Sequence, residues 1–155
     1  MNFISPILLL GHLRPQKPYG TFYEKNLEAK VNGISLSVKS DFMIATGALD
    51  AFQKPYFHFQ TLKKVLPLRG NGKGASGNSM AQLLEAMLIA QELNKDGKPL
   101  YGVEIVGVIW RFVTFKDTTY CVSKEFISTN KDDLLMIIAI LRHFIWILEN
   151  KILVN

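Results

Sequence analysis

The sequence predicts an α/β fold in which a central mixed β-sheet is flanked by helices. The predicted order of elements is a helix, several strands, a helix, two strands and a helix, which is typical of an α/β sandwich. Asn32-Gly33 is a strong hairpin signal between two of the strands. The 155 residues are enough for one compact core, so we expect a single domain over residues 1–155.

The first part of the chain is predicted to be a short helix followed by strands. Phe3 to Leu13 has helical character and ends before Pro15, which cannot continue a helix. Residues 46–54 are expected to form a connection between two strands. Strands are expected over residues 27–31, 34–39, 41–45 and 55–65.

A glycine-rich loop and a helix follow. Residues 69–79 read RGNGKGASGNS and contain no apolar anchor. They also lack the Gly-Lys-Ser/Thr ending of a nucleotide-binding loop. We expect a helix over 79–94, with Ser79 and Gln82 in a capping box and Gly97 just past its end.

The last part of the chain is predicted to be two strands and a helix. Residues 101–115 read YGVEIVGVIWRFVTF, and their β-branched and aromatic content predicts one long strand. Residues 120–126 are expected to return antiparallel to it. The final helix is expected over 131–148, capped by Asn130. It is apolar on most sides, so we expect it to pack on the sheet or on a second copy of the chain.

The composition excludes several classes of protein. A hydrophobic fraction of 48% and a charged fraction of 20% are ordinary for a globular protein, which argues against a disordered chain. The single cysteine, Cys121, excludes an internal disulfide and predicts a buried thiol in a reducing compartment. Trp110 and Trp146 are expected in the core. A signal peptide is not expected, because no basic residue precedes the N-terminal apolar run and no small-residue cleavage site follows it. A membrane span is not expected, because Arg142 and His143 interrupt the apolar C-terminal run. We therefore expect a cytoplasmic protein.

Residues that can perform chemistry lie between Ser40 and Lys64. Side chains alternate along a strand, so Thr61 and Lys63 share one face of the strand that ends there. If the two strands of this segment are neighbours, Asp41 and Lys63 converge, which places an acid beside a base at the edge of the sheet. This pair is the minimum for a metal-dependent phosphodiester site. The net charge of +5 permits an anionic partner such as nucleic acid.

These residues resemble the PD-(D/E)XK nuclease superfamily, whose fold is the restriction-endonuclease-like core. Small uncharacterised bacterial members have a strand that usually reads Pro-Tyr-Phe-x-x-Gln-Glu-x-Lys, and residues 55–63 of this chain read PYFHFQTLK. Asp41, the helix that begins near Gln82 and the strand pair after it extend the similarity over nearly the whole chain. Relatives generally have more helix before the position of Phe3, so the resemblance also implies a shortened copy.

The resemblance implies a Mg²⁺ site and a role for several residues. Asp41 would be the first metal-binding carboxylate, the Leu62 carbonyl a further ligand, and Lys63 the residue that positions water. Thr61 stands where the superfamily has its second carboxylate. Some relatives with a hydroxyl residue there take the acid from the following helix, and Glu85, with Gln82 one turn before it, is the candidate. Residues expected to contact the nucleic-acid backbone are Lys64, Arg69 and Lys73.

Two other interpretations stay open. A catalytically inactive relative would serve as a nucleic-acid-binding or protein-interaction module, and its apolar final helix would be a dimer face. A defective fragment would have no activity of its own. Individual residues also have plain structural explanations: Lys63 and Lys64 as solvated lysines of an edge strand, and Glu85 as part of the solvated face of its helix.

Overall fold

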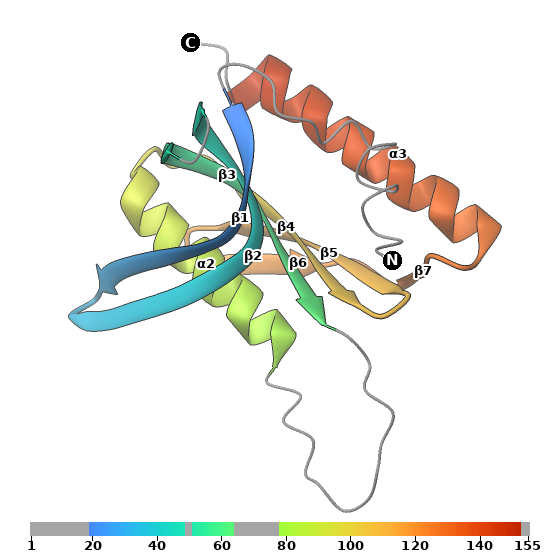
Figure 1. Cartoon of the computed structure of the whole chain (residues 1–155), viewed down its shortest axis with the longest axis horizontal. Helices are drawn as coiled ribbons and strands as arrows, with labels where there is room; N and C mark the ends of the chain where they lie inside the picture. The colour runs from blue at the N-terminus through green and yellow to red at the C-terminus, as the bar shows by residue number, and fades with distance from the viewer. Residues whose placement is uncertain (1–18, 49–50, 64–77, 153–155) are drawn as a thin grey trace, which may run out of the picture.

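The computed structural model describes residues 19–48, 51–63 and 78–152, with the backbone alone at 47–48, 51–63 and 152. These residues form an α/β structure in which one mixed sheet lies between two helices (Figure 1). The strands are β1 (Tyr19–Val31), β2 (Ile34–Ala48), β3 (Ala51–Lys63), β4 (Leu100–Val106), β5 (Ile109–Lys116), β6 (Thr119–Val122) and β7 (Phe126–Ile127). The helices are α2 (Ser79–Asn94) and α3 (Lys131–Ile147), and a short π-helical turn, η1 (Leu148–Ile152), follows α3.

The strands lie side by side in the order β1-β2-β3-β4-β5-β6, and β7 also pairs with β5. β3 and β4 are parallel, and the chain between them contains α2, which crosses one face of the sheet. The other neighbouring strands are antiparallel. The predicted mixed sheet flanked by helices is therefore confirmed.

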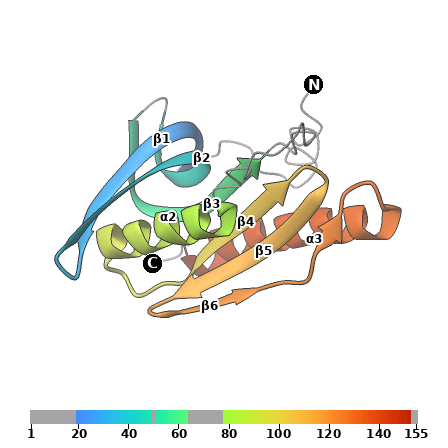
Figure 2. The same cartoon turned by 90° about the horizontal axis from the view of Figure 1, so that it is seen from below.

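Each face of the sheet has its own hydrophobic cluster, because successive side chains of a strand point to opposite faces. Figure 2 shows α2 on one face and α3 behind the sheet. On the α2 face, Met43, Leu100 and Val113 pack with Leu83 and Met87 of the helix. On the α3 face, strand and helix residues form the second cluster; its members include Phe42, Ile44, Val103, Ile105, Trp110, Ile137, Leu141 and Phe144.

The first hairpin is confirmed, and its strands are longer than predicted. Asn32 and Gly33 both have positive φ, 49° and 82°, as a tight hairpin turn requires. β2 runs unbroken from 34 to 48, so Asp41 lies in the middle of a strand and not near its start. Residues 46–48 and 51–54, expected in a connection, are strand. The register between β2 and β3 shifts on either side of Ala45, which lets the two strands stay paired past a local irregularity.

The single long strand expected over residues 101–115 is wrong. β4 and β5 form an antiparallel hairpin that turns at Gly107 and Val108, where Gly107 has a φ of 61°. Both strands are rich in apolar residues, so hydropathy does not reveal the turn between them. The structural consequence is that Glu104 and Arg111 face each other across the hairpin.

The helices predicted over 79–94 and 131–148 are confirmed, with one correction at a cap. The side chain of Asn130 accepts hydrogen bonds from the backbone N–H groups of Asp132 and Asp133 and caps α3 as expected. At α2, the N-cap is Asn78 and not Ser79: Asn78 Oδ1 accepts from Ala81 N at 3.2 Å. Ser79 has a tertiary partner instead.

Two predictions about burial are wrong, and one is confirmed. Cys121 is exposed because β6 is a sheet edge whose four residues are all exposed. Trp146 is 49% exposed on the outer side of α3, where it stacks on His143 with ring centroids 5.7 Å apart. Trp110 is fully buried, as predicted. The expected helix at Phe3 to Leu13 and residues 69–77 of the glycine-rich segment lie outside the described residues.

No helix in the described part of the chain combines the length and the apolar character needed to cross a membrane.

Candidate active site

A row of four residue positions crosses the sheet, one on each of four neighbouring strands. Thr61 of β3 is in register with Glu104 of β4, and Glu104 is in register with Arg111 of β5. On the other side of β3, Phe42 pairs with Gln60, so Asp41 of β2 stands next to the Thr61 position. The row is therefore Asp41, Thr61, Glu104 and Arg111.

This row belongs to the face that α2 covers. Residues at alternate positions of a strand share a face. Met43, Leu100 and Val113 pack in the α2-side cluster, so Asp41, Glu104 and Arg111 share that face with them. The first residue of α2, Ser79, lies within hydrogen-bond distance of Glu104, which places the start of the helix over the row.

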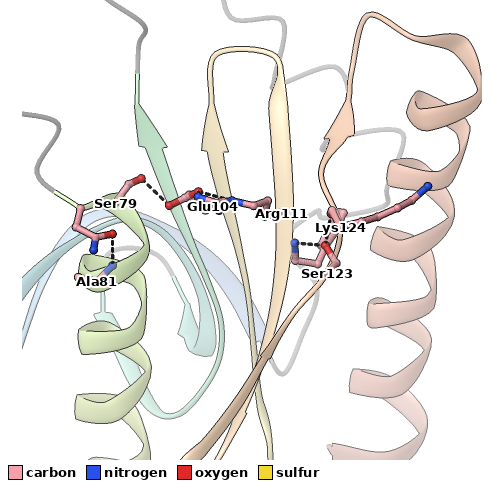
Figure 3. Close-up of polar contacts among 8 residues, drawn as sticks. Ser79, Ala81, Glu104, Arg111, Ser123 and Lys124 are labelled. Atoms are coloured by element: carbon pink, nitrogen blue, oxygen red, sulfur yellow. Dashed lines mark hydrogen bonds and ion pairs between the residues drawn. The ribbon is translucent and has the colours of Figure 1, made fainter.

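Glu104 is the centre of a buried polar network (Figure 3). Its side chain is 2% exposed. Ser79 Oγ donates a hydrogen bond of 2.6 Å to Glu104 Oε2, and Arg111 Nε donates one of 2.9 Å to Oε1. Arg111 Nη2 also donates to Oε1. Both carboxylate oxygens thus have partners, as a buried charge requires.

Arg111 differs from Glu104 in its access to solvent. Its side chain is 36% exposed, against 2% for the carboxylate that it contacts. The guanidinium therefore bridges the interior and the surface, while the acid is enclosed. An exposed cation keeps water as an alternative partner, whereas an enclosed carboxylate depends on the groups around it.

The structure places the backbone positions of Asp41 and Lys63, the acid and base of the predicted site, on neighbouring strands. β2 and β3 are neighbours, which was the condition for Asp41 and Lys63 to converge. Lys63 is the last residue of β3 and pairs with Val106, two positions beyond the row. Leu62, whose carbonyl was a predicted ligand, pairs with Ile105. Neighbouring strands lie about 4.8 Å apart, so Asp41, Thr61 and Glu104 occupy successive steps of that length.

The structure does not place the two helix candidates in this row. Gln82 is exposed on the outer side of α2. Glu85 is half-buried and follows Leu83, which packs on the sheet, by two residues; it is therefore rotated by roughly 200° about the helix axis from Leu83. It also lies six residues beyond Ser79, about 9 Å further along the helix. The role of Glu85 as a ligand stays a prediction, and its placement gives that role no support.

The donor types available for a metal ion can be judged from the row. Mg²⁺ prefers oxygen ligands, and Asp41, the Thr61 position, the Leu62 carbonyl and Glu104 offer oxygen atoms. Within residues 19–48, 51–63 and 78–152 no group of three or more His, Cys, Asp and Glu side chains is gathered in one place. The donor chemistry therefore fits Mg²⁺, with two carboxylates at most from this part of the chain. Lys64, Arg69 and Lys73, predicted to contact nucleic acid, lie outside the described residues.

The sequence interpretation missed Glu104 and Arg111. The available signal was one acid and one base inside an otherwise apolar segment, VEIVGVIWRF. In a hairpin that turns at residues 107–108, these two residues are opposite each other. A single long strand over residues 101–115 would not place Glu104 opposite Arg111, so the pair was not predicted.

Comparisons of the chain with models of known protein families, with curated proteins and with solved structures found no match.

Proposed function

We propose that this chain is a nuclease-like domain of the restriction-endonuclease-like type that hydrolyses phosphodiester bonds of DNA with the help of Mg²⁺. The observation that supports this proposal is the position of Asp41 on β2 beside the Thr61–Lys63 end of β3. An acid and a base on neighbouring strands, two positions apart in the register, are the starting set for phosphoryl-transfer chemistry. The net charge of +5 favours a polyanionic substrate.

Each residue in the proposed site has a distinct task. The Asp41 carboxylate and the Leu62 carbonyl would hold Mg²⁺, which when bound polarises a phosphate oxygen and lowers the pKa of water. Lys63 would orient the attacking water and stabilise negative charge that develops on the phosphate. The half-buried position of Asp41 leaves it accessible from solvent while the sheet fixes its backbone.

The architecture around the site agrees with this proposal. A mixed sheet between two helix layers, with the parallel pair β3 and β4 joined through α2, is the kind of core that the resemblance implies. α2 begins over the row at Ser79, which contacts Glu104, and Glu104 is in register with Thr61 near the end of β3.

Cleavage of supercoiled plasmid and of single-stranded DNA in Mg²⁺ or Mn²⁺ tests the proposal. We expect metal-dependent cleavage by the native chain. We expect the cleavage rate of Lys63→Ala to be at least tenfold lower. Lys30→Ala is the matched control, because Lys30 is an exposed lysine near the far end of the β1–β2 hairpin. Absence of cleavage by the native chain, or equal cleavage by both variants, would refute it.

A second candidate function is supported by the residue at position 61. Threonine replaces the second carboxylate that the resemblance implies there, and Glu104 next to it is already neutralised by Arg111. An inactive module would bind nucleic acid or another protein without cleaving DNA. In the same assay this function predicts no cleavage by the native chain and a gain of cleavage in Thr61→Glu.

A protein-interaction role would involve the outer side of α3. Leu135, Met136 and Trp146 are 57%, 50% and 49% exposed there. This apolar surface is compatible with the predicted dimer, which stays a prediction.

A further inference from the structure

We propose that Glu104 supplies the carboxylate that position 61 lacks, and that Arg111 is its counterion only while no divalent cation is bound. This inference rests on the proposed function, since it completes the same site. It identifies a metal-ligand residue on β4, a strand that the sequence interpretation did not connect with the site.

Glu104 lies close to the position of the missing carboxylate. It is in register with Thr61, so it stands one strand away from the place where a second carboxylate is expected. Asp41 stands one strand away on the other side. The Cα atoms of Asp41 and Glu104 are thus separated by about 10 Å, twice the spacing of neighbouring strands. A Glu side chain is longer than an Asp side chain, and the two carboxylates can approach each other across the residue between them.

The two oxygens of Glu104 differ in their partners. Among the side chains that the structure describes, both Arg111 contacts are made to Oε1, whereas Oε2 contacts the neutral hydroxyl of Ser79. A serine hydroxyl can rotate and can accept as well as donate a hydrogen bond. Oε2 is therefore the oxygen that a cation can reach first, while Ser79 keeps the carboxylate near the row.

The two side chains of the ion pair, Glu104 and Arg111, differ in their exposure to solvent. Glu104 is enclosed and needs a positive partner at all times, because a lone buried carboxylate is strongly disfavoured. Arg111 is 36% exposed, so its guanidinium can move into solvent at low cost. The acid is the fixed member of the pair, and the cation is the exchangeable one.

Glu85, the alternative source of a carboxylate, has none of these properties. It lies about one and a half turns beyond Ser79 on α2 and on a different side of the helix from Leu83. Glu85→Gln is therefore the matched control for Glu104→Gln, because both variants remove one negative charge and keep the shape of the side chain.

Isothermal titration of the DNA-free protein with Mn²⁺ tests the inference. We expect Glu104→Gln to weaken Mn²⁺ binding by at least tenfold and Glu85→Gln to change it by less than twofold. Arg111→Met removes the competing counterion, so we expect it to bind Mn²⁺ more tightly than the native chain. A purely structural ion pair does not predict this gain in affinity.

The double variant Glu104→Gln/Arg111→Met guards against loss of folding. It replaces a buried ion pair by a neutral pair, a change that proteins often tolerate, and its circular dichroism and melting temperature establish that it is folded. We expect it to have lost Mn²⁺ binding. If the double variant binds Mn²⁺ as the native chain does, or if the native chain binds none, Glu104 is not a ligand. The cleavage assay with Lys63→Ala decides the proposed function independently of this result.

Discussion

The hydroxyl of Tyr19 connects the first described strand with the end of the last helix. Tyr19 is 3% exposed, and its hydroxyl donates a hydrogen bond of 3.2 Å to Glu149 Oε1 in η1. Burial, the negative charge of Glu149 and this hydrogen bond together raise the pKa of Tyr19 from 10.0 to about 12. Burial also raises the pKa of Tyr101. The folded protein thus favours the neutral phenol.

The raised pKa of Tyr19 predicts that the free energy of unfolding falls at high pH. Below pH 10 both states keep the proton, and the contribution is fully present. Between pH 10 and about 12 the unfolded chain releases the proton while the folded chain retains it, so the contribution is progressively lost. We expect the decrease in unfolding free energy from pH 9 to pH 11, measured with urea, to be smaller in Tyr19→Phe. An equal decrease in both proteins would contradict this prediction.

Asn78 and Ser79 show which residue-level features the sequence could reveal. Both are good N-cap residues, so sequence alone locates the start of α2 to within a residue. The choice between them is made by Glu104, 25 residues away, whose carboxylate takes the Ser79 hydroxyl. Burial of Cys121 and Trp146 was predicted wrongly for a similar reason: an apolar residue at a sheet edge or on an outer helix side has no local signal of its exposure.

At the scale of elements, α2 packs closely on β4. Both helices and the first hairpin were predicted because their caps, periodicity and turn residues are local. The β4–β5 hairpin was not, since Gly107-Val108 lies between two apolar strands. The close packing of α2 depends on Gly102: a Cβ atom there would lie 3.0 Å from Leu83 Cδ1 and 3.2 Å from Met87 Sδ.

Gly102→Ala is expected to destabilise the fold by about 1–3 kcal/mol, the usual cost of an added carbon in a tightly packed core. Leu83 and Met87 are fully buried, so a shift of either side chain would disturb the packed core around it. Leu83→Val should relieve part of the strain, so the double variant Gly102→Ala/Leu83→Val should lose less than the sum of the single changes. Urea unfolding measures all three, and an unchanged or higher stability of Gly102→Ala would contradict the expected close contact.

At the scale of the whole molecule, the layers were predictable and the complete site was not. The Asp41 side of the row follows from a local pattern, since residues 40–64 contain both strands concerned. The placement of Glu104 beside Thr61 depends on the parallel pairing of β3 with β4, which joins residues about 40 positions apart in sequence. No periodicity within one segment specifies such a pairing. The role proposed for Glu104 therefore follows only from the register of the assembled sheet.

Crystals of the native chain grown with Mn²⁺ provide the most direct test, because the anomalous signal of the ion locates it without reference to activity. We expect a peak at about 2.1 Å, the distance typical of hard cations such as Mg²⁺, from an Asp41 oxygen and a Glu104 oxygen. We also expect the Arg111 guanidinium to have left Glu104 for solvent. A peak coordinated by Glu85 without Glu104, or no peak beside Asp41, would contradict the site described above.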